Sequence, residues 1–386
     1  MRHKRTLFFV LLIAVLALLI YLQVRAWKRF DWASFRDGLE GLNNWSFYWR
    51  VLVAIALIYC ADALRALRWK IFLRPTRPGT SWLSLIAPQY IGFTGLALLG
   101  RPGEFIRPYL IAKRVNTTMA PQVAIWLVER VFDTGAVVAM FALDVLLSPR
   151  LHSLDRFVPV ILANDQSPMA YSFWQKTAVI FGLLFVAMVL GVWSLWLRGP
   201  AIAAWTCRRL SRISPAVGSS VEKKMTTMSS GLHTIRDVGS FLQITGISFA
   251  IWLIVAVAYC LITRAYGRAP LDLAFPILHA PGALSFSEAV LLMFASVAGG
   301  VITLPLVGGG TQLATIAVLS NTFGYADAPE IAVSCGMLLW LVTFMSIIPG
   351  GLVLARREHV SLRRLESEAG AEAKTEHATG PALPLP

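Results

Sequence analysis

The chain has 386 residues, of which 56% are hydrophobic and 15% are charged, and its formal net charge is +14. Soluble domains carry about 25% charged residues, whereas several windows here run for about 20 residues almost without charge, the length that crosses a bilayer. The composition excludes an ordinary soluble domain. It indicates an all-α polytopic membrane protein, because the strict alternation of β-barrel strands is absent.

The basic residues cluster in short loops between apolar segments. In a soluble protein such a charge would suggest nucleic-acid binding. Here it is typical of cytoplasmic loops and of contact with anionic lipid headgroups. We therefore expect membrane lipids as partners, and no nucleic acid. The four cysteines lie far apart and three are in apolar runs, which favours small packing residues over a disulfide framework or a metal site.

The first two apolar segments begin the expected transmembrane domain. Residues 7–24 are long for a signal-peptide core and no small-residue cleavage site follows, which predicts an uncleaved anchor. Residues 49–67 form the second expected span. It ends in a dense basic loop that we expect in the cytoplasm, and the basic residues are Arg65, Arg68, Lys70, Arg74 and Arg77. Asp62 and Arg65 are spaced to form a boundary ion pair.

Residues 81–112 form an apolar segment with a break at Gly100–Gly103. The basic loop precedes this segment, and Lys113 and Arg114 follow it. Basic residues therefore flank the segment on both sides, and basic loops lie in the cytoplasm. We predict that the segment enters from the cytoplasm and returns there as a re-entrant hairpin. Non-helical backbone at membrane depth requires surrounding protein or a watery cavity.

The remaining apolar segments complete the expected topology. We expect spans at 121–147, 177–197, 241–263 and 331–355, and an interrupted segment at 286–323. Loop 148–175 has few basic residues and should lie outside. Segment 198–240 is basic and should lie in the cytoplasm, with an amphipathic helix near Trp205. The tail after residue 365 is polar and expected to be disordered.

The segment 286–323 is broken at Pro305–Gly310. The span before it runs outward and the span after it runs inward, so the segment should begin and end outside. We therefore predict about six full spans plus two re-entrant helical hairpins of opposite orientation, or else about eight spans with two glycine-rich kinks. Paired interrupted segments in two oppositely oriented halves are a pointer to a transporter substrate site near the middle of the membrane.

Three ionisable residues follow the first break at intervals of three: Arg101, Glu104 and Arg107. On a helix that starts at Pro102 they would lie along one side, and the helix N-terminus would direct free N–H groups at a cavity. Two guanidinium groups beside it predict a phosphate site, with Gly103 in the turn. Alternatively, the arginines serve only to keep this end of the segment in the cytoplasm, as basic loops do, and Glu104 neutralises them.

A second group of charges lies within the span 121–147. Glu129 and Asp133 are four residues apart on one helical face, with Arg130 beside them. Ionisable residues within a span are costly and usually face a cavity or a partner. We expect the partner to be Arg101, Arg107 or Arg130 itself. The group could serve gating, proton coupling or internal pairing.

The second break supplies glycines and neutral polar groups. Gly308, Gly309 and Gly310 would let backbone approach a ligand, and Gln312 after them would offer hydrogen bonds. Tight packing between helices explains the three glycines equally well. Glu288, near the mouth of this hairpin, is a weak candidate.

Enzyme motifs are missing from the sequence. It has no GxxxxGK[ST], HExxH or GxSxG pattern, and the six histidines stand singly. We therefore expect no ATP, metal or cofactor, and no catalytic residues.

Four motifs in this order resemble the flippase-like transmembrane domain of lysylphosphatidylglycerol synthases, which also occurs alone as a family of uncharacterised membrane proteins. They are ALRALRW (63–69), GRPGEFIRPYLIAKR (100–114), VERVFD (128–133) and LPLVGGG (304–310). The matching site positions are Gly103, Glu104, Arg107, Glu129, Arg130 and Asp133. The resemblance implies a glutamate just after the last glycines, where this chain has Thr311 and Gln312.

The resemblance implies a lipid translocase, flippase-like or scramblase-like, that moves a phosphate-headgroup or polyprenyl-linked lipid between leaflets. We expect no synthase catalytic domain, because no segment between the expected spans is long enough to form one. The alternatives are a membrane enzyme acting on a lipid carrier and an accessory subunit that binds partners of an envelope lipid or glycan pathway. We expect a flippase-like domain at residues 1–365, a cytoplasmic tail at 366–386, and an inner (cell) membrane location with both termini cytoplasmic.

Overall fold

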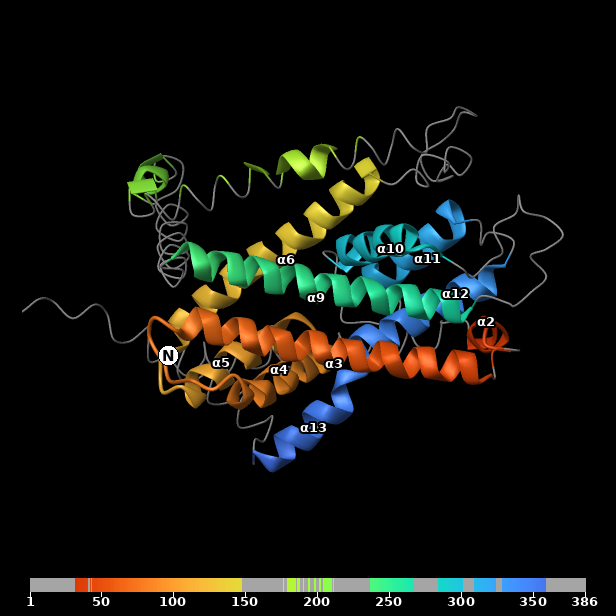
Figure 1. Cartoon of the computed structure of the whole chain (residues 1–386), viewed down its shortest axis with the longest axis horizontal. Coiled ribbons are helices and arrows are strands. Elements are labelled where there is room, and N and C mark those ends of the chain that lie inside the picture. The colour runs from red at the N-terminus through yellow and green to blue at the C-terminus, as the bar shows by residue number, and fades with distance from the viewer. Residues whose placement is uncertain are drawn as a thin grey trace, which may run out of the picture.

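A computed structural model describes residues 32–40, 42, 44–147, 237–266, 284–300, 309–323 and 328–358, together with scattered residues between 176 and 211. This part of the chain is helical and contains no strand, as the composition predicted (Figure 1). The expected first span, the loop at 148–175, most of 177–240, Gly308 and the tail lie outside the described residues. The structure therefore does not test those expectations.

Two long antiparallel helices run side by side through the molecule (Figure 1). They are α3 (Trp45–Leu73) and α9 (Val238–Ala265). Each begins at a side-chain cap, Asn44 for α3 and Asp237 for α9, which satisfies a backbone N–H of the first turn. At one end of the pair Arg50 Nη1 donates to the Arg264 carbonyl at 2.7 Å, and at the other Arg74 donates to Gln243 at 2.9 Å.

Helix α3 is longer than the predicted second span, and this corrects one expectation. We placed Arg68 in a basic loop after residue 67, but α3 continues to Leu73 and Arg68 is buried within it. No proline or glycine interrupts the sequence between Trp45 and Arg74, so nothing ends the helix earlier. The expected pair is present, with Arg65 Nη1 at 2.5 Å from Asp62 Oδ1.

The first interrupted segment folds as a helical hairpin. After the short turn η1 (Leu83–Leu85), its arms are α4 (Ile86–Leu99) and α5 (Ile106–Arg114), joined by the 3₁₀ turn η2 (Arg101–Phe105). The predicted break is present: Gly100 adopts a φ of 67°, a left-handed value that glycine tolerates. The helical arm begins at Ile106, so Glu104 and Arg107 do not share one regular helix as we expected.

Glycines bring the two arms of this hairpin into close contact. Side chains added at Gly92, Gly95 and Gly103 would meet, respectively, Arg107, Ile106 and the backbone of Gly95. The contacts pair earlier residues of α4 with later residues of α5, as antiparallel arms require. Arg77 Nη2 also donates to the Asn116 carbonyl at 2.7 Å, so the segments before and after the hairpin meet.

The second interrupted segment also forms two packed helices, α10 (Phe286–Gly299) and α11 (Gly310–Thr322). Gly299 lies against Gly310 and Ala314, where any side chain would clash. Ser285 and Glu288 form a reciprocal capping box at the start of α10. Glu288 therefore has a structural role at the first turn of this helix.

The two hairpins begin at opposite ends of the α3–α9 pair. Arg264 lies at the C-terminal end of α9, and its Nε donates at 3.3 Å to the Leu284 carbonyl just before α10. By contrast, the first hairpin follows the C-terminal end of α3, which lies beside the N-terminal half of α9. Each hairpin is followed by a long helix: α6 (Met119–Leu147) after the first, and a helix of residues 329–357 after the second.

The last helix is continuous but bent. It comprises α12 (Pro329–Trp340), the π-helical turn η7 (Leu341–Met345) and α13 (Ile347–Arg357). A π turn and Pro349 are both recognised causes of helix bending. Carbonyls at the bend accept hydroxyl hydrogen bonds, Ser346 from Tyr59 at 2.8 Å and Ile347 from Thr94 at 3.3 Å. The first part packs on α11 and α2 (Trp32–Asp37), the second on α4.

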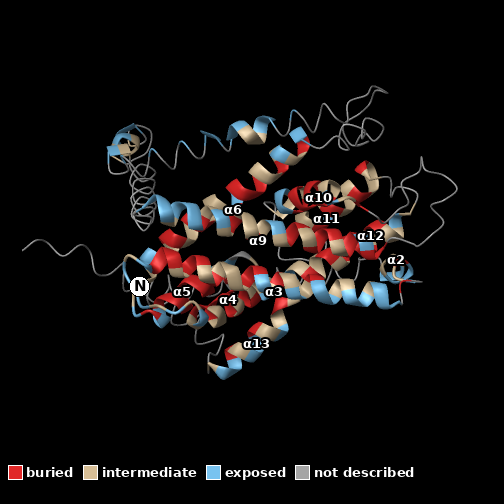
Figure 2. Cartoon of the chain, in the orientation of Figure 1, coloured by how far each residue is buried: buried red, intermediate tan, exposed pale blue. Residues whose placement is uncertain are grey.

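Two helices in the described part are long and apolar enough to cross a membrane, α9 and the bent helix of residues 329–357. Burial is concentrated between α3, α9, α10 and α12, while one side of the N-terminal half of α3 is exposed (Figure 2). Large apolar side chains stand on that exposed half, for example Trp45 at 79% exposure and Leu52 at 61%. A lipid environment would cover such side chains.

We expect Gly103→Ala to destabilise the protein by about 2 kcal/mol, because the new methyl group would overlap the Gly95 backbone across the hairpin. Thermal unfolding in detergent measures the loss. Gly246→Ala is the matched control, since a side chain there meets nothing within 4 Å. Equal stability of the two variants would contradict the close packing of the hairpin.

Candidate functional site

Arg68 stands at the centre of a buried ion network between three helices. Its Nη2 donates to Glu129 Oε1 at 2.6 Å, and its Nη1 donates to Asp133 Oδ1 at 2.7 Å. The same Nη1 lies 2.7 Å from Ser248 Oγ on α9. Arg68 is 0% exposed, so a single guanidinium connects α3, α6 and α9 without solvent.

Glu129 receives the largest number of these hydrogen bonds. Besides Arg68, it binds Arg107 with both oxygens, Nη1 to Oε1 at 3.1 Å and Nη2 to Oε2 at 2.5 Å. The indole of Trp69 also donates to Oε2, at 3.0 Å. The carboxylate is 0% exposed. Arg107 thereby ties the returning arm of the first hairpin, α5, to α6.

The local sequence explains this convergence. Glu129 and Asp133 are four residues apart and share one face of α6, so one guanidinium can reach both. Arg68 and Trp69 are adjacent in the last turns of α3 and approach the same carboxylate. Two arginines and two carboxylates give the network no net charge. The pairing satisfies charges that would be very costly alone at this depth.

The expected partners of Glu129 and Asp133 were Arg101, Arg107 and Arg130. Arg107 does pair with Glu129, and the partner of Asp133 is Arg68, which we missed. Its signal was present in the sequence: Arg65 and Arg68 continue the helical spacing of α3 with no helix breaker before Pro75. The side chain of Arg101 lies outside the described part of the structure.

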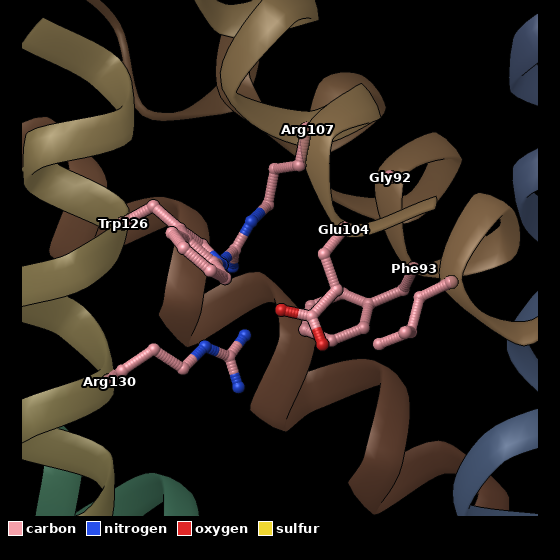
Figure 3. Close-up of a pocket in the computed structure, with 7 residues that line it drawn as sticks. Gly92, Phe93, Glu104, Arg107, Trp126 and Arg130 are labelled. Carbon is pink, nitrogen blue, oxygen red and sulfur yellow. The ribbon is translucent and has the colours of Figure 1, made fainter. Parts of the chain in front are cut away.

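A small pocket with a cavity volume of about 10 Å³ adjoins the network, between the first hairpin and α6 (Figure 3). Glu104 and Arg130 extend into it from opposite sides, and Arg107 reaches it from α5. Its lining residues are Gly92, Phe93, Leu96, Glu104, Arg107, Trp126 and Arg130. Small-molecule sites usually measure about 300–1,000 Å³. In this conformation the pocket has room for about one water molecule, so a larger group could enter only if the lining side chains moved apart.

Arg130 is placed differently from Arg68 and Arg107. Its guanidinium carbon lies 5.8 Å from the centre of the Trp126 ring, and its buried Nε has no hydrogen-bond partner among the described residues. Within the described part of the chain, neither Arg130 nor Glu104 forms an ion pair. Aromatic rings also lie beside two other arginines. The guanidinium carbons of Arg65 and Arg107 are 5.1 and 5.3 Å from the centre of the Phe93 ring.

The candidate residues of the second hairpin form a neutral cluster of their own. Gly309 N donates to Gln312 Oε1 at 3.0 Å, and Gln312 Nε2 approaches Met337 Sδ at 3.8 Å. Between α9 and α10, Tyr259 donates to Ser296 at 2.9 Å. Between described residues, no hydrogen bond joins Gln312 to the ion network. A role for Gly309, Gly310 and Gln312 in one shared site stays a prediction.

The ionisable groups of the site suit an anion better than a metal ion. Among residues that the structure describes, no three histidine, cysteine, aspartate or glutamate side chains are grouped so as to hold a metal. Glu129 and Asp133 are engaged by arginines. Among the described lining residues, two buried donors have no hydrogen-bond partner, Trp126 Nε1 and Arg130 Nε. The Arg130 guanidinium is the charged one, and its planar fork matches phosphate oxygens.

Comparison with known proteins supports the resemblance seen in the motifs. A family model described as "Lysylphosphatidylglycerol synthase TM region" matches residues 8–351. The match includes both hairpins, the ion network and the pocket. Neither the curated proteins nor the solved structures contain a match to this chain.

We expect Arg68→Met to destabilise the protein by about 3–5 kcal/mol, because it leaves Asp133 buried without its ion-pair partner. The double variant Arg68→Met, Asp133→Asn should recover a large part of this loss, since it removes the uncompensated charge as well. Thermal unfolding in detergent would compare both with the wild type.

Arg74→Met is the matched control for the Arg68 variants. Arg74 caps the C-terminal end of the same helix and hydrogen-bonds Gln243 on an exposed surface, so its loss should cost less than about 1 kcal/mol. If Arg68→Met were as mild as Arg74→Met, or if Asp133→Asn deepened the loss, the network would not have the role assigned to it.

Proposed function

Because the chain belongs to the family of the lysylphosphatidylglycerol synthase TM region, we propose that it moves a lipid with a phosphate-containing headgroup between the two leaflets of a membrane, without ATP. The family match supports a membrane domain related to lipid handling. Translocation itself is our proposal.

The observation that carries the proposal is the Arg130 guanidinium, which lines the pocket beside the first hairpin. Arg107 is offset by Glu129, and Arg130 has no ion pair among the described residues. An incoming phosphate can therefore bind Arg130, with the outer edge of Arg107 nearby, and need not displace Glu129. The hydrogen bonds from arginine to the phosphate would offset the free energy that the headgroup loses when it gives up its hydrating water.

The arrangement of the hairpins supports alternate opening to the two sides. Helices α4 and α10 have 14 residues each and extend about 21 Å, less than the roughly 30 Å of hydrocarbon. We propose that both hairpins are re-entrant, each reaching the middle of the membrane from its own side. Discontinuous helices in oppositely oriented halves are a known arrangement in transporters.

The charges at the helix ends support an orientation. The basic C-terminal ends of α3, α5 and α13 meet at one end of the molecule, where Arg77 bonds the Asn116 carbonyl and Arg114 pairs with Glu358. Trp45, Tyr48 and Trp49 mark the other end of α3. We propose that the basic end is cytoplasmic and the aromatic end lies at the outer interface. The first hairpin then opens to the cytoplasm.

We expect Arg130→Gln to slow translocation by about tenfold, equivalent to about 1.4 kcal/mol, because it removes the cation that holds the phosphate. The assay follows acyl-labelled phosphatidylglycerol in proteoliposomes, with a membrane-impermeant quencher of the label. Arg36→Gln is the control, since Arg36 is exposed on α2 and distant in sequence from the site.

Two outcomes would contradict this proposal. One is a wild-type rate no faster than that of protein-free liposomes. The other is a folded Arg130→Gln protein that matches the wild type, which would remove the pocket from the pathway. Formation of a chemically changed lipid by the purified protein would instead favour a membrane enzyme.

The proposed orientation predicts the labelling of single cysteines from the two sides of the membrane. In a chain whose four native cysteines are replaced, Gly79→Cys and Asn116→Cys should react with an impermeant maleimide from the cytoplasmic side only. Glu40→Cys, before α3, should react from the outer side only. Reaction of residues 79 and 116 from opposite sides would show that residues 81–112 cross the membrane and do not return.

A further inference from the structure

We infer that the bent helix of residues 329–357 is a lever, a rigid element that turns about a fixed point, and that it couples the two hairpins. The fixed point is its contact with Tyr59 of α3. The inference rests on the proposed function in one respect, that the hairpins open in turn. It adds the part of the fold through which a displacement at one hairpin reaches the other.

The two halves of this helix pack on different hairpins. On α12, a side chain added at Gly336 would lie 2.7 Å from Ile316 Cγ1 of α11, in the second hairpin. On α13, a side chain added at Gly351 would overlap Thr94 and the Tyr90 carbonyl of α4, in the first hairpin. Small residues at such contacts let helix backbones approach closely. Each half is therefore packed tightly enough to move together with its own hairpin.

The bend changes the direction of the helix without interrupting it. Across the π turn η7, Ser346 N donates to the Leu341 carbonyl at 2.9 Å, which is the five-residue spacing of a π turn. Figure 1 shows the helix crossing the molecule obliquely from α12 to α13. A continuous helix is a rigid element that can carry a displacement from one end to the other. A single helix thus connects α11 with α4.

The middle of the helix is attached to α3 through Tyr59. The Tyr59 hydroxyl donates to the Ser346 carbonyl at 2.8 Å, and a side chain added at Gly350 would lie 2.8 Å from the Tyr59 ring. Tyr90 in turn donates to the Tyr59 carbonyl at 2.9 Å. Helix α3 is itself held to α6 and α9 by Arg68. A rigid helix fixed at its middle moves its two ends in opposite directions when it turns, so movement of one hairpin moves the other the opposite way.

The test measures amide hydrogen exchange by mass spectrometry in lipid nanodiscs, which reports local opening and does not depend on transport. Gly336→Ala forces α12 away from α11, because the new methyl group overlaps Ile316. Exchange should rise about fivefold in peptides of α11 and at least about twofold in peptides of α4, which packs on the opposite half of the lever. A rise confined to α10, α11 and α12 would overturn the inference.

Two comparisons separate coupling from a general loss of stability. Peptides of α6 that contain Glu129 and Asp133 should exchange at the wild-type rate, because the ion network holds this segment. A rise there equal to the rise in α4 would indicate general unfolding and contradict the lever. Gly246→Ala on α9 is the matched control and should change neither hairpin, since a side chain there meets nothing within 4 Å.

Tyr59→Phe tests the pivot, because it keeps the ring and removes the hydrogen bond to Ser346. Combined with Gly336→Ala, it should reduce the rise in α4 to about half or less and leave the rise in α11, since coupled sites do not give additive effects. Simple addition of the two effects would contradict a pivot at Tyr59.

The lipid assay in proteoliposomes tests the proposed function separately. Coupled exchange without lipid translocation would support the lever and refute the transport proposal. Translocation with exchange changes confined to the second hairpin would refute the lever alone.

Discussion

The structure depends on the ion pair between Arg68 and Glu129. Both side chains are fully buried, at an N–O distance of 2.6 Å. A single unpaired charge at this position would cost several kcal/mol in protein and more in lipid, so each buried charge requires its partner. This requirement fixes four segments at once: the end of α3, the returning arm α5, the middle of α6 and the N-terminal half of α9.

The same requirement explains why a binding pocket adjoins the network. Glu129 draws Arg107 inward and so holds α5 against α6, and the glycines of α4 let the other arm of the hairpin close over it. The pocket lies where the turn η2 meets α6. The network is neutral without Arg130, and the Nε of this arginine has no hydrogen-bond partner among the described residues. A rigid neutral scaffold beside an available cation is a suitable arrangement for an anion that must bind and then leave.

A good part of this arrangement could be predicted from the sequence. Helix breakers marked both hairpins, and the i, i+4 spacing of Glu129 and Asp133 placed them on one face. Arg68 was missed because a basic cluster at the end of an apolar run has the same composition whether it lies in a loop or in a continuing helix. Only the packing of α6 and α9 on the last turns of α3 distinguishes the two. The separate roles of Arg107 and Arg130 also depended on tertiary contacts. The spacing of the sequence favoured Arg107 for a phosphate site and Arg130 as one possible partner of Glu129, whereas in the structure Arg107 pairs with Glu129 and Arg130 lines the pocket.

The most direct test of the central claim is an experimental structure of the protein in lipid nanodiscs containing phosphatidylglycerol. We predict a lipid phosphate within hydrogen-bond distance of the Arg130 guanidinium, while Glu129 keeps its bonds to Arg68 and Arg107. A phosphate that displaces Glu129 from Arg107, or an Arg130 paired with Glu104 in a pocket closed to lipid, would contradict the claim.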